Sequence, residues 1–169
     1  MVVPSLSIRS YPVTVTAPRR PSFVDLTEDL VEAVVHGGIT EGSVTVYCTH
    51  TTCGVLVNEW EDGALEDLLC RLEALVPTDA YYAHDDFGRR TQNLRSTEPI
   101  NGRAHVAQML LGATSVTIPV AGGKALLGRW QRLLFLELDG PKPRTLVFQV
   151  SGVSAIEPCK TPERLPLNR

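Results

Sequence analysis

Hydrophobic and polar residues alternate in several short runs of the chain, a pattern typical of half-buried β-strands. Residues 7–16, SIRSYPVTVT, predict one strand, in which Pro12 favours an edge position or a bulge because proline cannot donate a ladder hydrogen bond. Within residues 43–59, the β-branched run SVTVYCT and the run CGVLVNE predict two more strands. The corner T-H-T-T separates these two strands.

Four closing strands are predicted near the end of the chain. Their sequences are SVTIPV, KALLG, RLLFLEL and RTLVFQVSG. The segments AGG at residues 121–123 and DGPKP at residues 139–143 predict hairpin turns between neighbouring strands. Short connections of this kind favour antiparallel pairing.

Apolar residues at helical spacing predict helices between the strands. The stretch VDLTEDLVEAVVHGG reads as a strand end followed by a short helix, with an N-cap at Asp25 or Thr27 and a stop at Gly37 and Gly38. A second helix starts near Glu61 and ends before Pro77. Its apolar face is predicted to contain Leu65, Leu68, Leu69, Leu72 and Val76.

A further amphipathic helix is predicted in NGRAHVAQMLLG, residues 101–112. Strands first, inserted helices and then closing strands predict an α+β fold with a mainly antiparallel β-sheet and two to three helices. The 169 residues suit a single compact domain covering residues 1–169. We expect its folded core at about residues 6–153 and a flexible tail at residues 157–169, which are rich in proline and charge.

Charge and composition narrow the classes of function. The formal net charge is −3, so the chain lacks the basic character of a general nucleic-acid binder. No run approaches the roughly 20 apolar residues that a membrane span needs, and the first residues do not resemble a signal peptide. We therefore expect a cytoplasmic protein without nucleic-acid or membrane partners. Four cysteines without a C-x-x-C pair make a disulfide framework or a thiolate zinc site unexpected.

Three of the four histidines are candidates for chemistry. His36 lies in the last turn of a predicted helix, where the helix dipole favours an imidazolium, and this is a structural position. His50, His84 and His105 lie at element ends or in the long connection after residue 77. If they converge, they offer nitrogen ligands for zinc or a similar divalent ion, although no H-x-x-x-H or H-E-x-x-H pair supports this.

Carboxylates beside these histidines extend the candidate site. Glu59 follows an apolar strand and would need a partner there, which makes it a candidate general base or metal-orienting group. Asp62 has an equally good structural role as the N-cap of the next helix. Asp85 directly follows His84 and is a second candidate proton acceptor.

Anion-binding candidates are found outside the histidine set. The sequence N-G-R at residues 101–103 precedes a helix, whose free N–H groups suit a phosphate, and Arg103 adds a guanidinium. The sequence GGK at residues 122–124 lacks P-loop spacing, and a hairpin turn explains it. Trp130 and Gln131 could stack on and bind a heteroaromatic ring, although a lone tryptophan is more often in a core or an interface.

Several ordered blocks of the sequence resemble one known family. The blocks are CTHTTCGVLVNEWED, YYAHDD, NGRAHV, SVTIPV, GRWQR and LELDGP. Together they resemble the YjbQ-like family, described as secondary thiamine-phosphate synthase enzymes, over most of residues 7–152. The resemblance implies a compact α+β domain, a homotrimer and, in some members, a divalent metal ion such as zinc or magnesium.

The resemblance also implies a set of site residues in this chain. The catalytic candidates that it implies are His50, Glu59 and His84, to which Asp85 is added by its place after His84, and the metal candidates are His50, His84 and His105. The substrate-binding candidates that it implies are Thr51, Thr52, Asn58, Asp62, Asn101, Trp130, Gln131 and Glu137, and the N-G-R sequence adds Arg103 to them. The family often has a histidine where this chain has Arg103. The loop at residues 87–99 is longer than in the shortest members and carries Arg89, Arg90 and Arg95, which could bind substrate phosphate or modify access to the site.

Three functions are compatible with these residues. The first is a transferase that joins a hydroxymethylpyrimidine diphosphate to a thiazole phosphate and releases pyrophosphate, since arginines and a divalent ion would stabilise the leaving diphosphate. The second is a metal-dependent hydrolase of a small phosphorylated or cyclic metabolite, because histidines are unusual ligands for magnesium. The third is a non-catalytic trimer that binds such a metabolite.

Overall fold

The structure of the protein is a computed structural model that describes residues 5–19, 21–112 and 114–154. The predicted tail at residues 157–169 and Cys159 lie outside the described residues. The elements are, in chain order, β1 (Ser5–Val15), β2 (Ser22–Asp25), α1 (Thr27–Gly37), β3 (Glu41–Cys48), β4 (Cys53–Glu59), α2 (Asp62–Leu75), the 3₁₀ turn η1 (Ala83–Asp85), α3 (Gly102–Leu111), β5 (Ser115–Ala121), β6 (Lys124–Ala125), β7 (Gln131–Glu137) and β8 (Arg144–Ser154).

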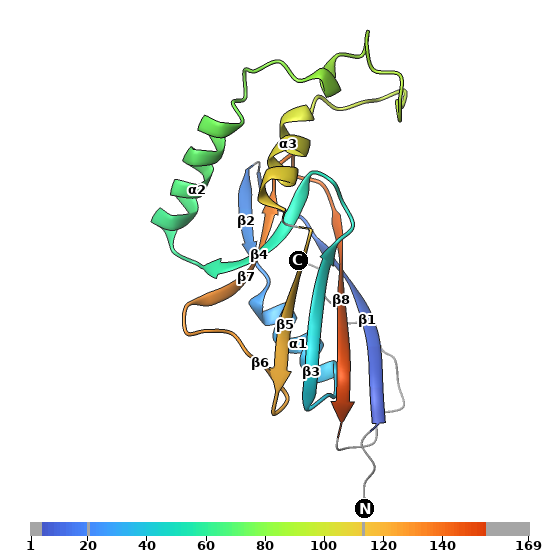
Figure 1. Ribbon diagram of the computed structural model, residues 1–169, viewed down its shortest axis with the longest axis vertical. Coiled ribbons are helices and arrows are strands. Elements are labelled where there is room, and N and C mark those ends of the chain that lie inside the picture. Colours follow the sequence, from blue (N-terminus) through green and yellow to red (C-terminus); the bar gives the residue numbers. More distant parts are fainter. Residues whose placement is uncertain (1–4, 20, 113, 155–169) are drawn as a thin grey trace, which may run out of the picture.

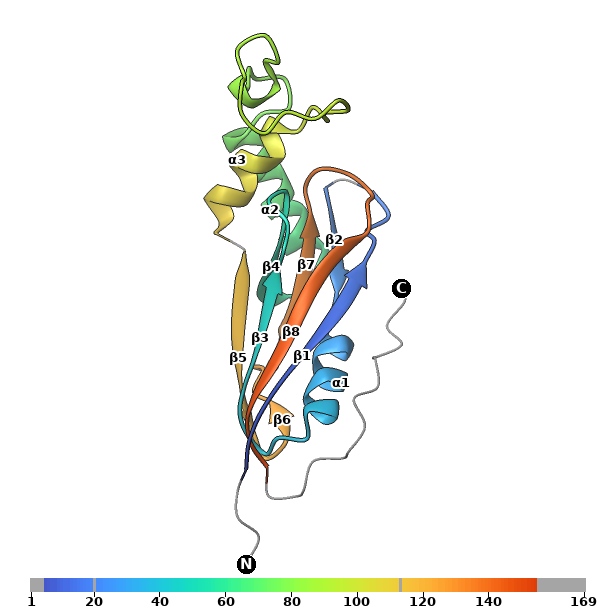
Figure 2. The same cartoon turned by 90° about the vertical axis from the view of Figure 1, so that its right-hand side faces the viewer.

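The strands form two antiparallel sheets (Figure 1). The larger sheet has the order β1-β8-β3-β5-β6, and the smaller one has the order β2-β7-β4. α1 packs against β1 and β8 of the larger sheet and against β7 of the smaller one, and Figure 2 shows it beside the lower halves of β1 and β8. The predicted α+β fold with a mainly antiparallel sheet is confirmed.

β1 is an edge strand, as Pro12 indicated. Its only sheet neighbour among the described strands is β8, and Pro12 lies opposite Val147 in an unbroken ladder. A proline is tolerated here because its missing N–H interrupts no hydrogen bond on the free edge. The alternative of a bulge is therefore not needed.

The two strands predicted around T-H-T-T are β3 and β4, but they belong to different sheets. β3 lies between β8 and β5, whereas β4 pairs with β7. The corner at residues 49–52 therefore carries the chain from one sheet to the other. This places His50 at one end of the space between the sheets.

The hairpin predicted at residues 139–143 is wrong, because β7 and β8 also lie in different sheets. β7 is the central strand of the smaller sheet, and Leu133 to Leu136 are buried on both of its faces. A strand that is buried on both faces has a continuous apolar sequence. Such a sequence does not indicate whether the next strand along the chain pairs with it or joins another sheet. The hairpin predicted at residues 121–123 is confirmed, with Gly122 and Gly123 both at positive φ.

The main hydrophobic core fills the space between the two sheets and α1. Side chains of both sheets alternate into it, with Val44 and Val46 from β3, Phe135 from β7, and Phe148 and Val150 from β8. Each of these side chains is at most 1% exposed. The register of the strands is set by this burial, because a slip by one residue would turn the apolar set outward.

A second, smaller core lies on the other face of β7. It contains Leu136 and Leu138, Leu72 from α2, and Ala104 and Ala107 from α3. Of the apolar residues predicted to form the buried face of the second helix, only Leu72 and the adjoining Val76 are fully buried. Much of α2 is therefore exposed in a single chain.

The caps of the first two helices differ from the predictions. Leu26 occupies the N-cap position of α1, and Asp25 accepts a hydrogen bond from the Thr27 N–H. Glu61, and not Asp62, caps α2: its two carboxylate oxygens accept hydrogen bonds from the N–H groups of Gly63 and Ala64. The side chain of glutamate is one methylene longer than that of aspartate, so Glu61 reaches these N–H groups from the position before Asp62.

The connection between α2 and α3 extends beyond the ends of both sheets (Figures 1 and 2). It contains η1 and the irregular segment that follows it, and it carries His84 into the neighbourhood of α3. Within the described part of the chain, no helix is both long and apolar enough to cross a membrane.

Gly38 provides a test of how α1 ends. It adopts a left-handed conformation with φ 63°, and a Cβ atom added there would meet nothing within 4 Å. We expect Gly38→Ala to lower the free energy of unfolding by about 1 kcal/mol, because only the backbone conformation is penalised. Gly140→Ala is the matched control, since Gly140 has the same free space without a positive φ. Equal losses in urea unfolding of the two variants would contradict this explanation.

Candidate active site

Polar residues from four separate segments meet at one end of the space between the sheets. The Thr145 N–H donates to His50 Nε2 at 2.8 Å, and the Leu138 N–H donates to the Thr52 carbonyl oxygen. Asn101, at the start of α3, donates from Nδ2 to Asp139 at 3.2 Å. We call this region the polar end; it contains His50, Asn101, Glu137, Asp139 and Arg144.

A buried ion pair lies at the polar end of the core. Arg144 donates from Nε to Glu137 Oε2 at 2.7 Å and from Nη2 to Glu137 Oε1 at 2.8 Å. The same Oε1 atom accepts hydrogen bonds from the N–H groups of Asp139 and Gly140. Glu137 is 0% exposed, so this predicted substrate-binding residue is fully engaged within the protein.

Asp139 connects this pair to the surface. Its Oδ2 atom accepts from Lys142 Nζ at 2.6 Å and lies 3.6 Å from Arg144 Nη2. Burial opposes ionisation of Asp139, but the hydrogen bonds from Lys142 and Asn101 outweigh it and hold the pKa of the carboxyl below its usual range. Asp139 is therefore a fixed negative charge at neutral pH.

Asp85 caps α3 from outside the helix. Its Oδ1 atom accepts from the N–H groups of Asn101 at 3.0 Å and of Gly102 at 2.9 Å. A side chain at position 102 would collide with Tyr82 and the carboxylate of Asp85, so the close approach requires glycine. The N–H groups that the sequence offered to a phosphate are thus already occupied by a carboxylate.

The side-chain oxygen of Asn101 is the unusual atom of the polar end. Asn101 is 8% exposed, and its Oδ1 atom is buried without a hydrogen-bond partner among the described residues. A buried acceptor left unsatisfied costs about 1–3 kcal/mol. Such a group is a candidate for binding a ligand that donates a hydrogen bond.

His84 and His105 lie against each other. Their ring centroids are 4.3 Å apart and the rings are tilted by 45°. Arg90 Nη1 lies 3.1 Å from His84 Nε2, and because a guanidinium only donates, Nε2 accepts and the ring carries its proton on Nδ1. Burial and the neighbouring His84 lower the pKa of His105 below its ordinary value of 6.5. His105 is thus suited to the neutral form.

Arg90 organises the loop that carries His84. Besides His84, its guanidinium donates to the carbonyl oxygens of Gln92 at 3.1 Å and Asn93 at 3.2 Å. It also pairs with Glu98 at 3.2 Å, and both side chains are less than 15% exposed. The sequence drew attention to the arginines of this loop as candidate phosphate ligands, whereas Arg90 mainly serves to fold the loop.

His50 does not join the other two histidines. Its Nε2 atom accepts the Thr145 N–H, so its proton resides on Nδ1. Burial and the charge of Arg144 lower its pKa below the ordinary value of 6.5. Behind it, the Cys53 thiol hydrogen bond lowers the pKa of the Cys48 thiol to about 7.

The three histidines do not fit a metal centre within one chain. Among the described residues, no group of three or more His, Cys, Asp or Glu side chains could hold a metal ion. Arg90 also places a positive charge against the His84 ring nitrogen that a cation would need. The divalent ion implied by the family resemblance stays a prediction.

Five predicted site residues lie at the opposite end of the smaller sheet. Cys53 pairs with Glu137 at the polar end of the β4–β7 ladder, and Glu59 pairs with Gln131 at the other end. Six residue steps of a strand separate these pairs by roughly 20 Å. We call the second set the distal group; it consists of Asn58, Glu59, Asp62, Trp130 and Gln131.

The distal group is open to solvent. Glu59 is exposed at the strand end, so it does not need the buried partner that the sequence suggested. Trp130 is 60% exposed, and the Arg129 guanidinium lies 4.5 Å from its ring centroid. Within one chain these residues cannot act on the same small molecule as His84 and His105.

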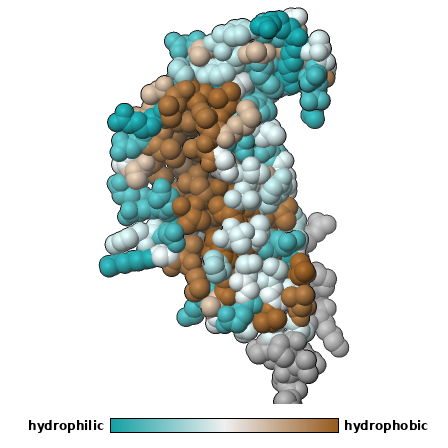
Figure 3. All heavy atoms as spheres, in the orientation of Figure 1, coloured by the Kyte–Doolittle hydropathy of each residue, from teal (hydrophilic) through white to brown (hydrophobic). Residues whose placement is uncertain are grey.

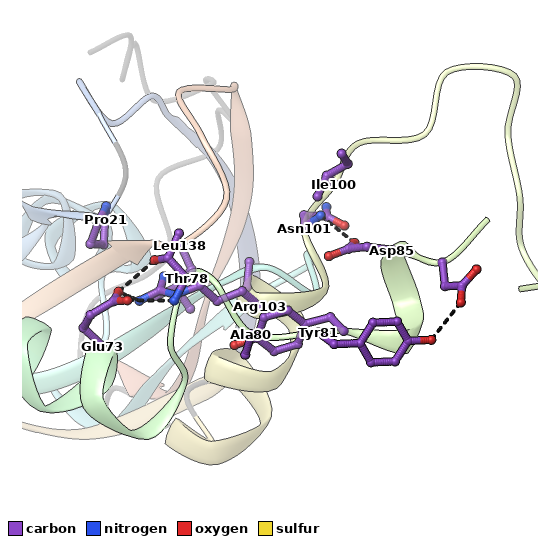
Figure 4. Close-up of a pocket in the computed structure, with 13 residues that line it drawn as sticks. Pro21, Glu73, Thr78, Ala80, Tyr81, Asp85, Ile100, Asn101, Arg103 and Leu138 are labelled. Carbon is purple, nitrogen blue, oxygen red and sulfur yellow. Dashed lines mark hydrogen bonds and ion pairs between the residues drawn. The ribbon is translucent and has the colours of Figure 1, made fainter. Parts of the chain in front are cut away.

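Two hollows flank η1. One, of 630 Å³, is lined by Tyr81, Asp85, Asn101 and Arg103 among others (Figure 4). Arg103 does not point freely into it, because its guanidinium donates to the Val76 carbonyl oxygen at 2.8 Å and to Glu73 at 2.7 Å. The predicted anion-binding role of Arg103 therefore competes with a bridge between α2 and α3.

The other hollow, of 540 Å³, is more cationic. It is lined by His84, Arg89 and Arg90 together with neighbouring loop residues. Arg89 is exposed and donates to the Tyr81 hydroxyl at 3.0 Å. This hollow brings one imidazole and two guanidinium groups to the same surface depression.

The chain is similar to known proteins over most of its length. The family described as UPF0047 protein YjbQ-like matches residues 11–153. A UPF0047 protein of Archaeoglobus fulgidus is 41% identical over 137 residues, which cover 81% of this chain and 97% of that protein. The UPF0047 protein YugU of Bacillus subtilis is 30% identical over 135 residues, which cover 79% of this chain and 92% of YugU.

Solved structures share the fold. A YbjQ-like protein of unknown function from Sulfolobus solfataricus P2 superposes with a TM-score of 0.76 at 26% identity, covering 88% of this chain and 99% of that one. A hypothetical protein from Aeropyrum pernix K1 gives a TM-score of 0.71 at 32% identity, covering 85% and 97%. The fold thus defines a class of two-sheet α+β proteins. This chain belongs to the UPF0047 (YjbQ-like) family, and the resemblance seen in the sequence is confirmed.

Two members of the polar end, Asp139 and Arg144, were missed by the sequence interpretation. Arg144 could have been found from its position, because it shares the inward register of Leu146 and Phe148. Glu137 similarly continues the register of Leu133 and Phe135. Opposite charges at core-facing positions of two strands indicate a buried pair.

The buried pair can be tested by a double-mutant cycle. We expect Arg144→Met to lower the free energy of unfolding by about 3–5 kcal/mol, because it leaves the Glu137 carboxylate buried without its partner. Adding Glu137→Gln should recover part of that loss. Arg103→Met, which removes a partly exposed pair, serves as control and should cost at most about 1 kcal/mol. Additive losses across the cycle, measured by urea unfolding, would show that the two side chains are not coupled.

Proposed function

We propose that this protein is an enzyme that acts on small phosphorylated metabolites at the His84–His105 pair. The observation that carries this proposal is the cationic hollow lined by His84, Arg89 and Arg90, directly beside that pair. Guanidinium groups are the preferred protein partners of phosphate oxygens. Lys142, half exposed and anchored on Asp139, adds a further cation at the polar end.

The first reaction we propose is the transfer implied by the family resemblance. It joins a hydroxymethylpyrimidine diphosphate to a thiazole phosphate. The thiazole nitrogen forms a bond to the pyrimidine methyl carbon while the carbon–oxygen bond to the diphosphate breaks, and pyrophosphate leaves. Negative charge grows on the leaving oxygen, where Arg89 and the His84 Nδ1–H are suited to stabilise it. The unsatisfied Asn101 oxygen is suited to accept a hydrogen bond from an amino group such as that of an aminopyrimidine.

A hydrolase is the second candidate, and the lowered pKa of His105 favours it. A histidine that stays neutral at neutral pH can accept a proton from an attacking water molecule. In that case Asp139 would stabilise the imidazolium that forms, since its charge raises the pKa of His105 against the effects of burial and His84. A general base of this kind requires no transfer partner.

We further propose that the protein works as a homo-oligomer, of which a trimer is the predicted form. α2 and α3 carry exposed apolar side chains, including Leu75, Met109 and Leu110, each more than 60% exposed. Figure 3 shows a broad apolar surface that runs from the region of α2 and α3 down the molecule. A contiguous apolar surface of this kind marks an interaction site.

Assembly would also account for the distal group. Its residues lie roughly 20 Å from the polar end along one strand ladder. A neighbouring subunit could bring its own Trp130 and Glu59 to this chain's histidine pair. The exposed tryptophan would then stack on a heteroaromatic substrate, as the sequence led us to predict.

The first test is product formation by pure protein at defined zinc and magnesium content. Wild-type protein is expected to form thiamine phosphate from the two phosphorylated halves, and His84→Gln and His105→Gln should lower kcat/KM by about 10²–10⁴-fold. His36→Gln is the matched control, because His36 lies in α1 and donates to the Glu32 carbonyl oxygen. Its activity should equal that of wild type.

The other outcomes of the assay separate the candidates. Release of inorganic phosphate from either half alone, lost in His105→Gln, would favour the hydrolase. Its rate should then persist at pH 6.5, the ordinary pKa of a histidine, and fall only at lower pH, because the lowered pKa of His105 delays the protonation that removes the base. Calorimetric binding of a half with no turnover of any kind would overturn both enzymatic proposals.

The oligomer can be tested with a charge on its proposed contact surface. Met109→Asp is expected to reduce the molar mass measured by light scattering from that of a trimer to that of a monomer, because a buried unpaired carboxylate is costly. Val35→Asp is the matched control, since Val35 is equally exposed on α1, away from α2 and α3. A wild-type protein that is monomeric at micromolar concentration would contradict the proposed assembly.

A further inference from the structure

Two thiols face each other between the sheets, directly behind the T-H-T-T corner. Cys48 ends β3 and Cys53 begins β4, and their Sγ atoms are 3.3 Å apart. Both residues belong to the main core and are at most 1% exposed. Neither reaction proposed above uses these sulfur atoms.

The backbone already brings the two sulfur atoms close to bonding distance. A disulfide bond is about 2.05 Å long, so the sulfur atoms need to approach by roughly 1.3 Å. The two residues are joined only by the four-residue corner at residues 49–52. They also lie on different sheets, so a small closing movement need not break either ladder.

The corner is the place where a small reagent can enter. Thr49 and Thr51 are exposed, and His50 is half buried. Among the described residues, the corner is held by hydrogen bonds with Thr145 and Leu138 and by the Cys48 thiol, which donates to the His50 carbonyl oxygen. Local opening of such a segment costs much less than global unfolding.

We propose that Cys48 and Cys53 form a dithiol site that reacts with hydroperoxides and closes to an intramolecular disulfide. Hydrogen peroxide is the smallest member of this class and is close to water in size. Cys70, which lies exposed on α2, has no such geometry. The reactive pair therefore depends on the corner that brings Cys48 and Cys53 together, and another cysteine of the chain does not replace it.

The reaction proceeds in two balanced steps. One sulfur atom attacks a peroxide oxygen, the O–O bond breaks, and the thiol proton leaves with the second oxygen as water, which produces a sulfenic acid. The other thiol then attacks that sulfur, and its proton leaves with the hydroxyl group as a second water molecule. The two thiols are oxidised and the peroxide is reduced.

Formation of the disulfide would affect the polar end through His50. His50 lies between the two cysteines in sequence, and its Nε2 atom accepts the Thr145 N–H. Cys53 pairs with Glu137 across the β4–β7 ladder. Drawing the two sulfur atoms together therefore moves the corner relative to Thr145.

The test uses the full chain treated with hydrogen peroxide under native conditions, then denatured and alkylated. Cleavage after glutamate releases residues 42–59, which contain Cys48 and Cys53 and no other cysteine. We expect this peptide to be lighter by two hydrogen atoms, to resist alkylation, and to regain both thiols with a phosphine reductant. The Cys70→Ser variant should behave identically, and Cys53→Ser should lose the modification.

Cys70 in the same sample shows that the oxidant was sufficient. If Cys70 is fully oxidised while Cys48 and Cys53 both remain open to alkylation after denaturation, the proposal is overturned. A disulfide between two chains that peptide mapping assigns to Cys48 or Cys53 would overturn it as well. A second readout is the amide resonance of Thr145, which is expected to shift on oxidation of wild type and to stay unchanged in Cys53→Ser.

Discussion

The ion pair between Glu137 and Arg144 is the interaction on which the polar end depends. It lies where β7 leaves one sheet and β8 enters the other, so it joins the two sheets at the point where the chain crosses between them. Because Glu137 also accepts the Asp139 and Gly140 N–H groups, the same carboxylate shapes the connecting turn. Asp139 is thereby aimed at Asn101, and through Asn101 the start of α3 is tied to the sandwich.

This arrangement explains how a site forms from segments far apart in the sequence. The carboxylate of Asp85 caps α3 from the preceding loop, and the glycine at position 102 allows that approach. The histidines at positions 84 and 105 are brought together as a result. Catalytic chemistry at this pair would rest on a chain of buried polar contacts that begins in the core.

Much of the fold could be predicted from the sequence, because local patterns determine it. Alternation located β1, β3 and β4, Pro12 indicated the edge, and glycine marked the end of α1. The partner of β7 could not be predicted, since a strand buried on both faces carries no alternation to orient it. The two-sheet arrangement follows from long-range packing between β7 and β8 on opposite layers, which no local pattern encodes.

The sequence predicted several residues of the site, but it did not predict which of them lie close together. His84, His105, Asp85 and Asn101 do gather, whereas His50 is held by Thr145. The distal group was associated with them by the family resemblance, which gives no distance between the two ends of the strand from Cys53 to Glu59. In space that strand is fully extended, so its two ends face different surroundings.

The loop centred on Arg90 determines how firmly His84 is held. Its order comes from a single guanidinium that binds the carbonyl oxygens of Gln92 and Asn93, the ring of His84 and the carboxylate of Glu98. Leu94 on the same loop is 43% exposed, and no apolar cluster of the described residues includes the loop. Such a segment behaves as one cooperative unit, which is ordered or lost as a whole while both sheets persist. The orientation of His84 therefore shares the stability of this loop and not that of the core.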